Sequence, residues 1–153
     1  MIFDAEQSFS LPYPGPHEAA LAFLRDPQRS LGRVTFLQNV RVSESIVRAE
    51  MLVQVPMMGT LTLPFESELI LTNDGAHLTP RTLESQAWAE VGGSGAVQGT
   101  TLDYRFAFRV HVDMPTAEKW GGAAFEKMFH ATARRTLERL AKEFPDGVRA
   151  AMP

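Results

Sequence analysis

The feature that most constrains the fold is a long amphipathic pattern near the C-terminus, from Pro115 to Phe144. Its residues fall into rows with a spacing of four, two apolar and two mainly charged. The first apolar row contains Ala117, Gly121, Phe125, Phe129, Ala133, Leu137 and Ala141, and the second contains Trp120, Ala124, Met128, Thr132, Thr136, Leu140 and Phe144. This spacing predicts an amphipathic helix of about eight turns. Such a helix needs a large apolar partner surface, which the rest of the chain must supply.

The two apolar rows cannot both face one flat surface. A row with a spacing of four advances about 40° around an ideal helix at each step, because 3.6 residues make one turn. We therefore expect either a sheet that curls with the helix or a helix that bends near Gly121 and Gly122. Close packing of these two glycines against a strand is the alternative explanation for their presence.

The residues before the helix alternate between apolar and polar side chains, which predicts seven strands and one short helix. The expected strands are Phe3–Leu11, Arg33–Ser43, Val47–Val55, Leu61–Leu71, Ala76–Leu83, Gln86–Val91 and Leu102–Val112, with the short helix at Ala19–Leu24. Pro64 argues for a strand edge, a bulge or a break, since proline has no N–H to donate to a neighbouring strand.

Gly92, Gly93 and Gly95 follow the sixth expected strand and leave its end undecided. The strand could run on through them to Gln98. The glycines are then a hairpin tip, a bulge, or a place where the backbone approaches a ligand.

Three segments carry a resemblance to a known superfamily. They are PGPHEAALAFL, LDYRFAFRVHV and WGGAAFEKMFHATARRTLERL, in the order strand, short helix, six antiparallel strands and long helix. This order resembles the START-like, or SRPBCC, superfamily. The resemblance implies one α+β domain over residues 1–153: a seven-stranded curved antiparallel sheet wrapped around the long C-terminal helix, called a helix-grip fold, with one short helix after the first strand.

The resemblance also implies a cavity for a hydrophobic molecule between the sheet and the C-terminal helix. Larger members place another helix between the first helix and the second strand, where it roofs the cavity. Because this chain has little there, the resemblance implies a small or collapsed cavity. The segments are also similar to an uncharacterised family of small bacterial proteins, which supplies no catalytic residues to transfer.

Aromatic side chains, methionine and two threonines are the candidates for the wall of such a cavity. The predicted ligand-binding residues are Trp88, Tyr104, Phe106, Phe108, Trp120, Phe125, Met128, Thr132 and Thr136. Aromatics and methionine form adaptable apolar surfaces, and the threonine hydroxyls would orient a ligand. A packed core, with the threonine hydroxyls bonded back to the helix, fits the same pattern.

Composition and motifs exclude several classes of function. The net charge of -3 argues against nucleic-acid binding, and the lack of cysteine excludes disulfides and thiolate metal sites. The N-terminus is acidic and no apolar run is long enough to span a membrane, so we expect a cytoplasmic protein. The four histidines lie in separate segments, and nucleotide-binding fingerprints are missing, so we expect neither a metal nor a cofactor.

Three functions remain compatible with the sequence. The first is non-enzymatic binding of a small hydrophobic ligand between sheet and helix. The second is a structural or interaction protein with a filled core that acts through self-association as a homo-oligomer. The third is an enzyme similar to a cyclase or a hydrolase, as some members of the superfamily are.

Overall fold

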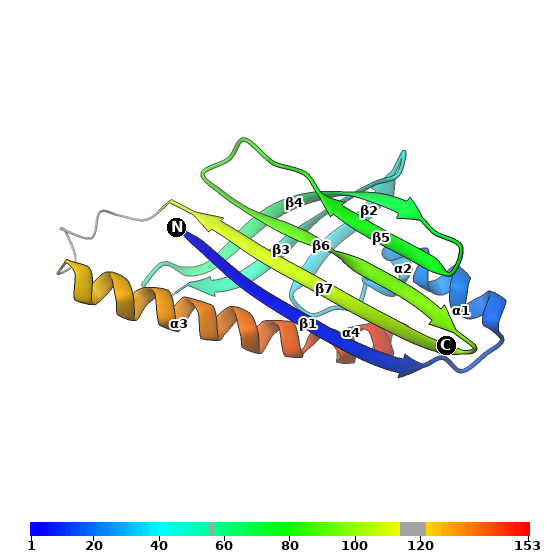
Figure 1. Ribbon diagram of the computed structural model, residues 1–153. Coiled ribbons are helices and arrows are strands. Elements are labelled where there is room, and N and C mark those ends of the chain that lie inside the picture. Colours follow the sequence, from blue (N-terminus) through cyan, green and yellow to red (C-terminus); the bar gives the residue numbers. More distant parts are fainter. Residues whose placement is uncertain (56, 114–121) are drawn as a thin grey trace.

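The computed structural model describes residues 1–55, 57–113 and 122–153, and these form one antiparallel sheet with helices on one of its faces (Figure 1). The strands are β1 (Ile2–Pro12), β2 (Leu37–Ser43), β3 (Ile46–Val55), β4 (Gly59–Leu71), β5 (Gly75–Pro80), β6 (Ala87–Gln98) and β7 (Thr101–Val112). Their order in the sheet is β1-β7-β6-β5-β4-β3-β2. The predicted α+β fold with a seven-stranded curved antiparallel sheet is therefore confirmed.

Four helices accompany the sheet: α1 (His17–Leu24), α2 (Pro27–Ser30), α3 (Ala123–Lys142) and α4 (Phe144–Ala150). The single-turn α2 is an addition to the predicted elements, and Asp26 caps it by accepting a hydrogen bond from the backbone N–H of Arg29. The helical pattern at the C-terminus divides into α3 and α4, with Pro145 in the first turn of α4, where proline is tolerated. The part of that pattern from residue 115 to 121 lies outside the described residues.

The glycines of β6 lie inside a regular strand. The pairing of β6 with β7 runs without a shift from Ala87 opposite Val112 to Gln98 opposite Thr101. Gly92, Gly93 and Gly95 are therefore part of neither a hairpin tip nor a bulge in this ladder, and the expected strand runs on to Gln98.

Pro64 lies in β4, but β5 does not extend far enough to pair with it. The β4–β5 ladder covers Ser67–Leu71, whereas Pro64 lies opposite Glu50 of β3. The side of Pro64 that lacks an N–H thus has no strand partner in the described ladders, which is the local edge that the sequence predicts.

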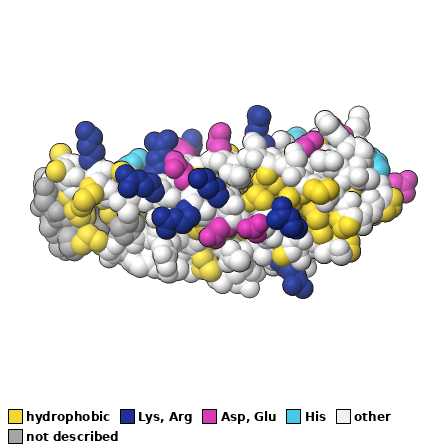
Figure 2. All heavy atoms as spheres, turned by 90° about the horizontal axis from the view of Figure 1, so that it is seen from below, with side chains coloured by type: hydrophobic (Ala, Val, Ile, Leu, Met, Phe, Trp, Pro, Cys, Tyr) yellow, Lys and Arg dark blue, Asp and Glu magenta, His cyan; other side chains and the backbone are white. Residues whose placement is uncertain are grey.

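The face of α3 that is buried moves around the helix along its length. Phe129 and Leu137 of the first apolar row are buried, together with the alanines between and after them. In the second row Met128 is 62% exposed, Thr136 is half-buried, and Phe144, at the start of α4, is fully buried. This change is what two slanted rows predict. Lys, Arg, Asp and Glu side chains are spread over the outer side of α3 (Figure 2).

Phe144 is the centre of an aromatic cluster that fills the space between the sheet and α4. Its ring centroid lies 4.2 Å from that of Phe106, 5.6 Å from those of Phe36 and Phe108, and 5.9 Å from that of Phe9. All of these side chains lie on the face of the sheet that carries the helices, hereafter the inner face. The core here is packed with rings.

Arg25, directly after α1, ties this helix to the turn between β4 and β5. Its Nε donates to the carbonyl of Gly75 at 3.1 Å, and a terminal nitrogen donates to the carbonyl of Thr72. We expect Arg25→Ala to lower the free energy of unfolding by about 1.5 to 3 kcal/mol, the usual range for hydrogen bonds from a charged donor. Urea denaturation measures this, with the exposed Arg33→Ala as the control. An equal effect of both variants would contradict the structural role of Arg25.

None of the helices within residues 1–55, 57–113 and 122–153 is long and apolar enough to cross a membrane.

Candidate functional site

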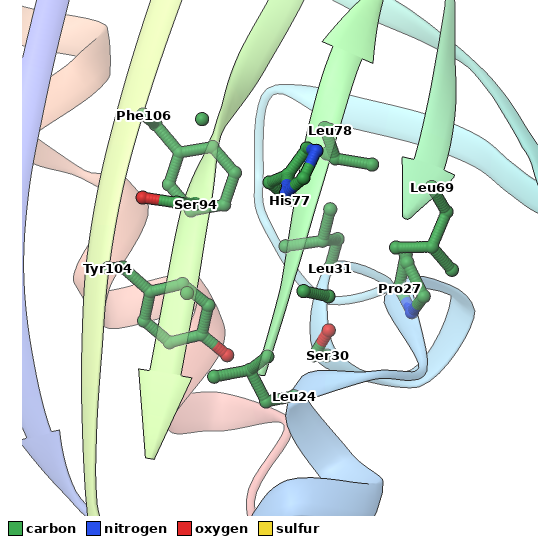
Figure 3. A pocket seen from close by; sticks show the side chains of 13 residues that line it. Leu24, Pro27, Ser30, Leu31, Leu69, His77, Leu78, Ser94, Tyr104 and Phe106 are labelled. Carbon is green, nitrogen blue, oxygen red and sulfur yellow. The ribbon is translucent and has the colours of Figure 1, made fainter. Parts of the chain in front are cut away.

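A small apolar pocket lies on the inner face, between strands β5–β7 and helices α1–α2 (Figure 3). Its volume is about 30 Å³. Leu24, Ser30 and Leu31 line it from the helices, and Leu78 and Tyr104 are among the residues that line it from the sheet. We call it the Tyr104 pocket. The Tyr104 pocket lies under α1 and α2. The cavity implied by the resemblance to the START-like superfamily would lie under the C-terminal helix instead.

Two glycines of β6, Gly93 and Gly95, line this pocket. Gly93 pairs with Phe106, and Gly95 pairs with Tyr104, so both glycines lie on the inner face beside aromatic residues of β7. A Cβ atom on Gly95 would lie 3.0 Å from Cδ1 of Leu24, which shows how closely α1 approaches the strand. The sheet therefore presents bare backbone at the floor of the pocket, where α1 approaches it closely. The third option raised for the glycines, an approach of the backbone to a ligand, stays a prediction.

The hydroxyl of Tyr104 is the one buried side-chain polar atom without a hydrogen-bond partner among the described residues. The residue is 6% exposed, and its hydroxyl points towards Leu24 and Ser30 (Figure 3). Ser30 does not use its own proton there, because its Oγ donates to the carbonyl of Asp26 at 2.9 Å. Burial raises the pKa of Tyr104 above its ordinary value, so the phenol remains protonated.

Tyr104→Phe is expected to raise the free energy of unfolding by about 1 kcal/mol, because it removes a buried polar group that has no partner. Thermal denaturation of the ligand-free protein measures this. Tyr13→Phe is a matched control, because Tyr13 is equally buried and its hydroxyl is not an unpartnered buried atom. A loss of stability in Tyr104→Phe alone would show that the hydroxyl already has a stabilising partner.

The structure brings together some of the residues predicted for a cavity wall. Tyr104 and Phe106 line the Tyr104 pocket. Phe108 lies on the same face and packs against Phe36 and Phe144. Phe125 is half-buried, and its ring centroid lies 6.1 Å from that of Phe129, away from the pocket residues of β7.

Other predicted residues lie elsewhere. Trp88 is on the outer face of β6, where its ring stacks on His111 with 3.9 Å between the centroids. Met128 and Thr132 are exposed, and the hydroxyls of Thr132 and Thr136 donate to backbone carbonyls one turn earlier, at 3.0 and 3.1 Å. This is the back-bonded arrangement considered for the threonines above. Trp120 lies outside the described residues.

Periodicity could have separated Trp88 from the pocket. Residues of β6 alternate between the faces, and Ala89 and Val91 belong to the buried inner side, so Trp88 must point outwards. No periodicity in the sequence could have identified Leu24, Ser30 and Leu31 as pocket residues. Their place in the lining depends on where α1 and α2 pack on the sheet.

The polar side chains near Trp88 pair with one another on the outer face of the sheet. Nε2 of His111 lies 2.6 Å from a carboxylate oxygen of Glu90, and Nε of Arg109 lies 2.7 Å from Asp4. The hydrogen bond that Arg109 donates to Asp4, together with the negative charges of Asp4 and Glu90, raises the pKa of Arg109. Within the described part of the chain, there is no cluster of three or more His, Asp or Glu side chains that could hold a metal ion.

Comparison with known families gives a match over residues 8–142, to the family described as "Protein of unknown function (DUF3809)". Comparison with curated proteins gives no match.

Several solved structures share the fold at low sequence identity. The protein TTHA0849 from Thermus thermophilus is 14% identical with a TM-score of 0.55, covering 97% of this chain and 98% of its own. The Zhui aromatase/cyclase from Streptomyces sp. R1128 is 8% identical with a TM-score of 0.58, covering 99% and 94%. The human StAR-related lipid transfer protein 5 is 9% identical with a TM-score of 0.54, covering 96% and 74%. These likenesses confirm the predicted helix-grip fold.

Proposed function

The chain belongs to the DUF3809 family, and from that premise and the geometry of the Tyr104 pocket we propose that it binds a small hydrophobic molecule without transforming it. The observation that carries the proposal is a pocket with apolar walls at which β6 has two glycines instead of side chains. Pockets of this kind, apolar with few polar groups, are typical of small-molecule sites.

The size of the pocket limits what can enter it. A volume of about 30 Å³ is much smaller than the roughly 300 to 1,000 Å³ of pockets that enclose a drug-sized ligand. Gly93, Gly95 and Leu69 are half-exposed, so the pocket reaches the surface. We therefore propose that a ligand inserts one slender apolar end, while the rest of it remains outside.

The lining favours binding over catalysis. The described lining residues include no Asp, Glu, Lys or Arg, and their side-chain hydroxyls are those of Ser30, Ser94 and Tyr104. His77 is the one histidine among them, and it alternates on β5 with the core residues Ala76 and Leu78, so its imidazole lies on the outer face. A cyclase or hydrolase that moves protons needs an acid and a base within reach of the same substrate. Of the structural neighbours, the StAR-related lipid transfer protein supports the binding proposal by its name, whereas the Zhui aromatase/cyclase represents the enzymatic alternative.

Gly95→Ala is the most direct test, because it adds one methyl group at the floor of the pocket. The new Cβ would lie 3.0 to 3.3 Å from side-chain atoms of Leu24, which can adjust. Alanine is also favoured over glycine in a strand by about 0.5 to 1 kcal/mol, so we expect the stability to change little. Ligand binding should fall at least tenfold, since a methyl group takes up much of the available volume.

The measurement is native mass spectrometry of the purified protein, followed by solvent extraction of any bound compound. The wild type should carry additional mass that is released as an apolar molecule, and Gly95→Ala should carry less. Thr132→Phe is the control, because it adds a large ring at an exposed position of α3. If Thr132→Phe lost the ligand and Gly95→Ala kept it, the site would lie at the C-terminal helix.

Self-association is the second candidate function, and exposed methionines favour it. Met57 and Met58, at the turn between β3 and β4, are 67% and 37% exposed, and Met128 on α3 is 62% exposed. Adaptable apolar side chains on a surface are typical of interaction sites. Sedimentation equilibrium tests this candidate: a homo-oligomer of defined mass that Met128→Lys dissociates would support it, and a monomer at all concentrations would exclude it.

A further inference from the structure

Resting on the proposed function, we infer that the Tyr104 hydroxyl anchors the ligand, and that the ligand is an uncharged apolar molecule with a hydrogen-bond acceptor at its buried end. Ketones, esters and ethers belong to this class. The acceptor atom at the end of the ligand would enter the pocket first and meet the Tyr104 hydroxyl there.

An unpartnered buried hydroxyl is the first observation behind the inference. Native proteins pair most buried polar groups, because a buried group left unpaired loses its hydrogen bonds to water without replacement. The Tyr104 hydroxyl lacks a partner among the described residues, although the side chain is almost completely buried. The hydroxyl points towards Leu24 and Ser30, which line the Tyr104 pocket (Figure 3). A ligand atom placed there would receive the missing hydrogen bond.

The Tyr104 hydroxyl is a hydrogen-bond donor, so the ligand atom that meets it must be an acceptor. Burial raises the pKa of the phenol, so at neutral pH it is an O–H group that donates. A carbonyl or ether oxygen accepts one hydrogen bond and needs no counter-charge. The Tyr104 pocket is thus suited to an acceptor at the end of an apolar chain.

No Lys or Arg lines the described pocket, and His77 alternates on β5 with the inward-facing Ala76 and Leu78, so the lining does not favour an ionised ligand end. A carboxylate would have to leave water with no Lys or Arg among the residues that line the pocket. Arg25, which follows α1, directs its donors to backbone carbonyls, and Arg29 lies over the ring of Phe23, 5.3 Å from its centroid. Neither cation faces the Tyr104 hydroxyl.

Water is a poor substitute for such a ligand. A buried water molecule normally makes about three hydrogen bonds. Besides the Tyr104 hydroxyl, the side chains near it offer the Oγ of Ser30 as an acceptor, whereas the walls contributed by Leu24, Leu31 and Phe106 offer none. A slender molecule that brings one acceptor and apolar carbons matches both the hydroxyl and the walls.

The test compares three probes of similar length: pentan-2-one, n-pentane and pentanoate. Each is titrated in a sealed tube into the full chain, and binding is followed by the NMR shifts of the methyl groups of Leu24, Leu31 and Leu78. The wild type is expected to bind pentan-2-one about five- to tenfold more tightly than n-pentane, and pentanoate more weakly than either.

Tyr104→Phe should abolish the preference for the ketone and leave the affinity for n-pentane within twofold of the wild type. Tyr13→Phe removes the only other tyrosine hydroxyl of the chain and should keep the preference. The retained n-pentane binding also shows that the variant is folded. If Tyr104→Phe retained the ketone preference, or if pentanoate bound best, the anchor would be refuted while binding at the pocket stood. If no probe shifted the methyl groups of the wild type, the proposed function and the anchor would both be overturned.

Discussion

Gly93→Ala is expected to destabilise the protein by about 3 to 5 kcal/mol, a large part of the roughly 5 to 15 kcal/mol that holds a domain folded. Two separate effects add at this position. The φ of Gly93 is +148°, a conformation that side chains other than glycine rarely adopt. A Cβ atom would also lie 2.0 Å from the carbonyl oxygen of Arg105 on β7, which is backbone and cannot move without opening the ladder. The free energy of unfolding from guanidinium titration measures the loss.

Two other glycines separate the two effects. Gly75 has no positive φ, but a Cβ atom there would lie 1.9 Å from the carbonyl oxygen of Gly95, so Gly75→Ala tests the clash alone. Gly99 has a φ of +63° with no atom near its Cβ position, so Gly99→Ala tests the conformation alone, at about 1 kcal/mol. We expect Gly93→Ala to be the most damaging of the three. A smaller effect than that of Gly99→Ala would mean that β6 and β7 are not paired as described.

Phe144→Ala is expected to lower the free energy of unfolding by about 3 to 5 kcal/mol, as is usual when a buried phenylalanine is truncated. The side chain is 0% exposed and contacts rings from β1, β7 and the segment before β2. Its removal leaves a cavity among these rings that the neighbouring backbone cannot fill. Thermal denaturation measures the loss, and Met128→Ala, at an exposed position of α3, should change stability by less than about 0.5 kcal/mol.

Phe144→Ala should also gain a binding site for a small apolar molecule. Apolar cavities created by truncation remain dry and accept small aromatic molecules. Benzene should therefore raise the melting temperature of Phe144→Ala and leave that of the wild type unchanged, since a ligand stabilises the state that binds it. If benzene had no effect on the variant, the ring cluster would have collapsed into the space. That result would mean that the core under α4 adapts more readily than a packed interior should.

The sequence predicted the sheet and the helices on the strength of repeated local patterns. Alternation identifies a strand and its two faces, and a spacing of four identifies the helix, so β7 and the pattern that contains α3 were the clearest elements. The resemblance to the START-like superfamily added the arrangement of these elements. The slant of the two apolar rows predicted that one flat surface could not bury the whole helix. It did not predict which end would be exposed, because Met128 was expected in the wall of a cavity and is exposed, whereas Phe144 is buried.

The pocket could not be predicted in the same way. Whether aromatic residues such as Phe106 and Phe108 enclose a space or fill it depends on distances between elements, and a pattern of residue types contains no distances. The roof formed by α1 and α2 depends on Arg25 reaching carbonyls some fifty positions away. Trp88 is a different case, because its position in the alternation of β6 already placed it on the outer face.

The shortness of β5 leaves few residue pairs between the two parts of the sheet on either side of it. In the described ladders, only the pairs from Gly75 to Leu78 link β5 to β6, whereas β6 is paired with β7 along its whole length. Across this seam, the hydroxyl of Ser67 on β4 donates to the carbonyl of Val91 on β6 at 2.5 Å. The Tyr104 pocket is lined by Leu69 on one side of the seam and by Tyr104 on the other. A molecule bound in this pocket, as proposed, would contact both sides of the seam, so its presence should slow amide hydrogen exchange in β5 more than in any other strand.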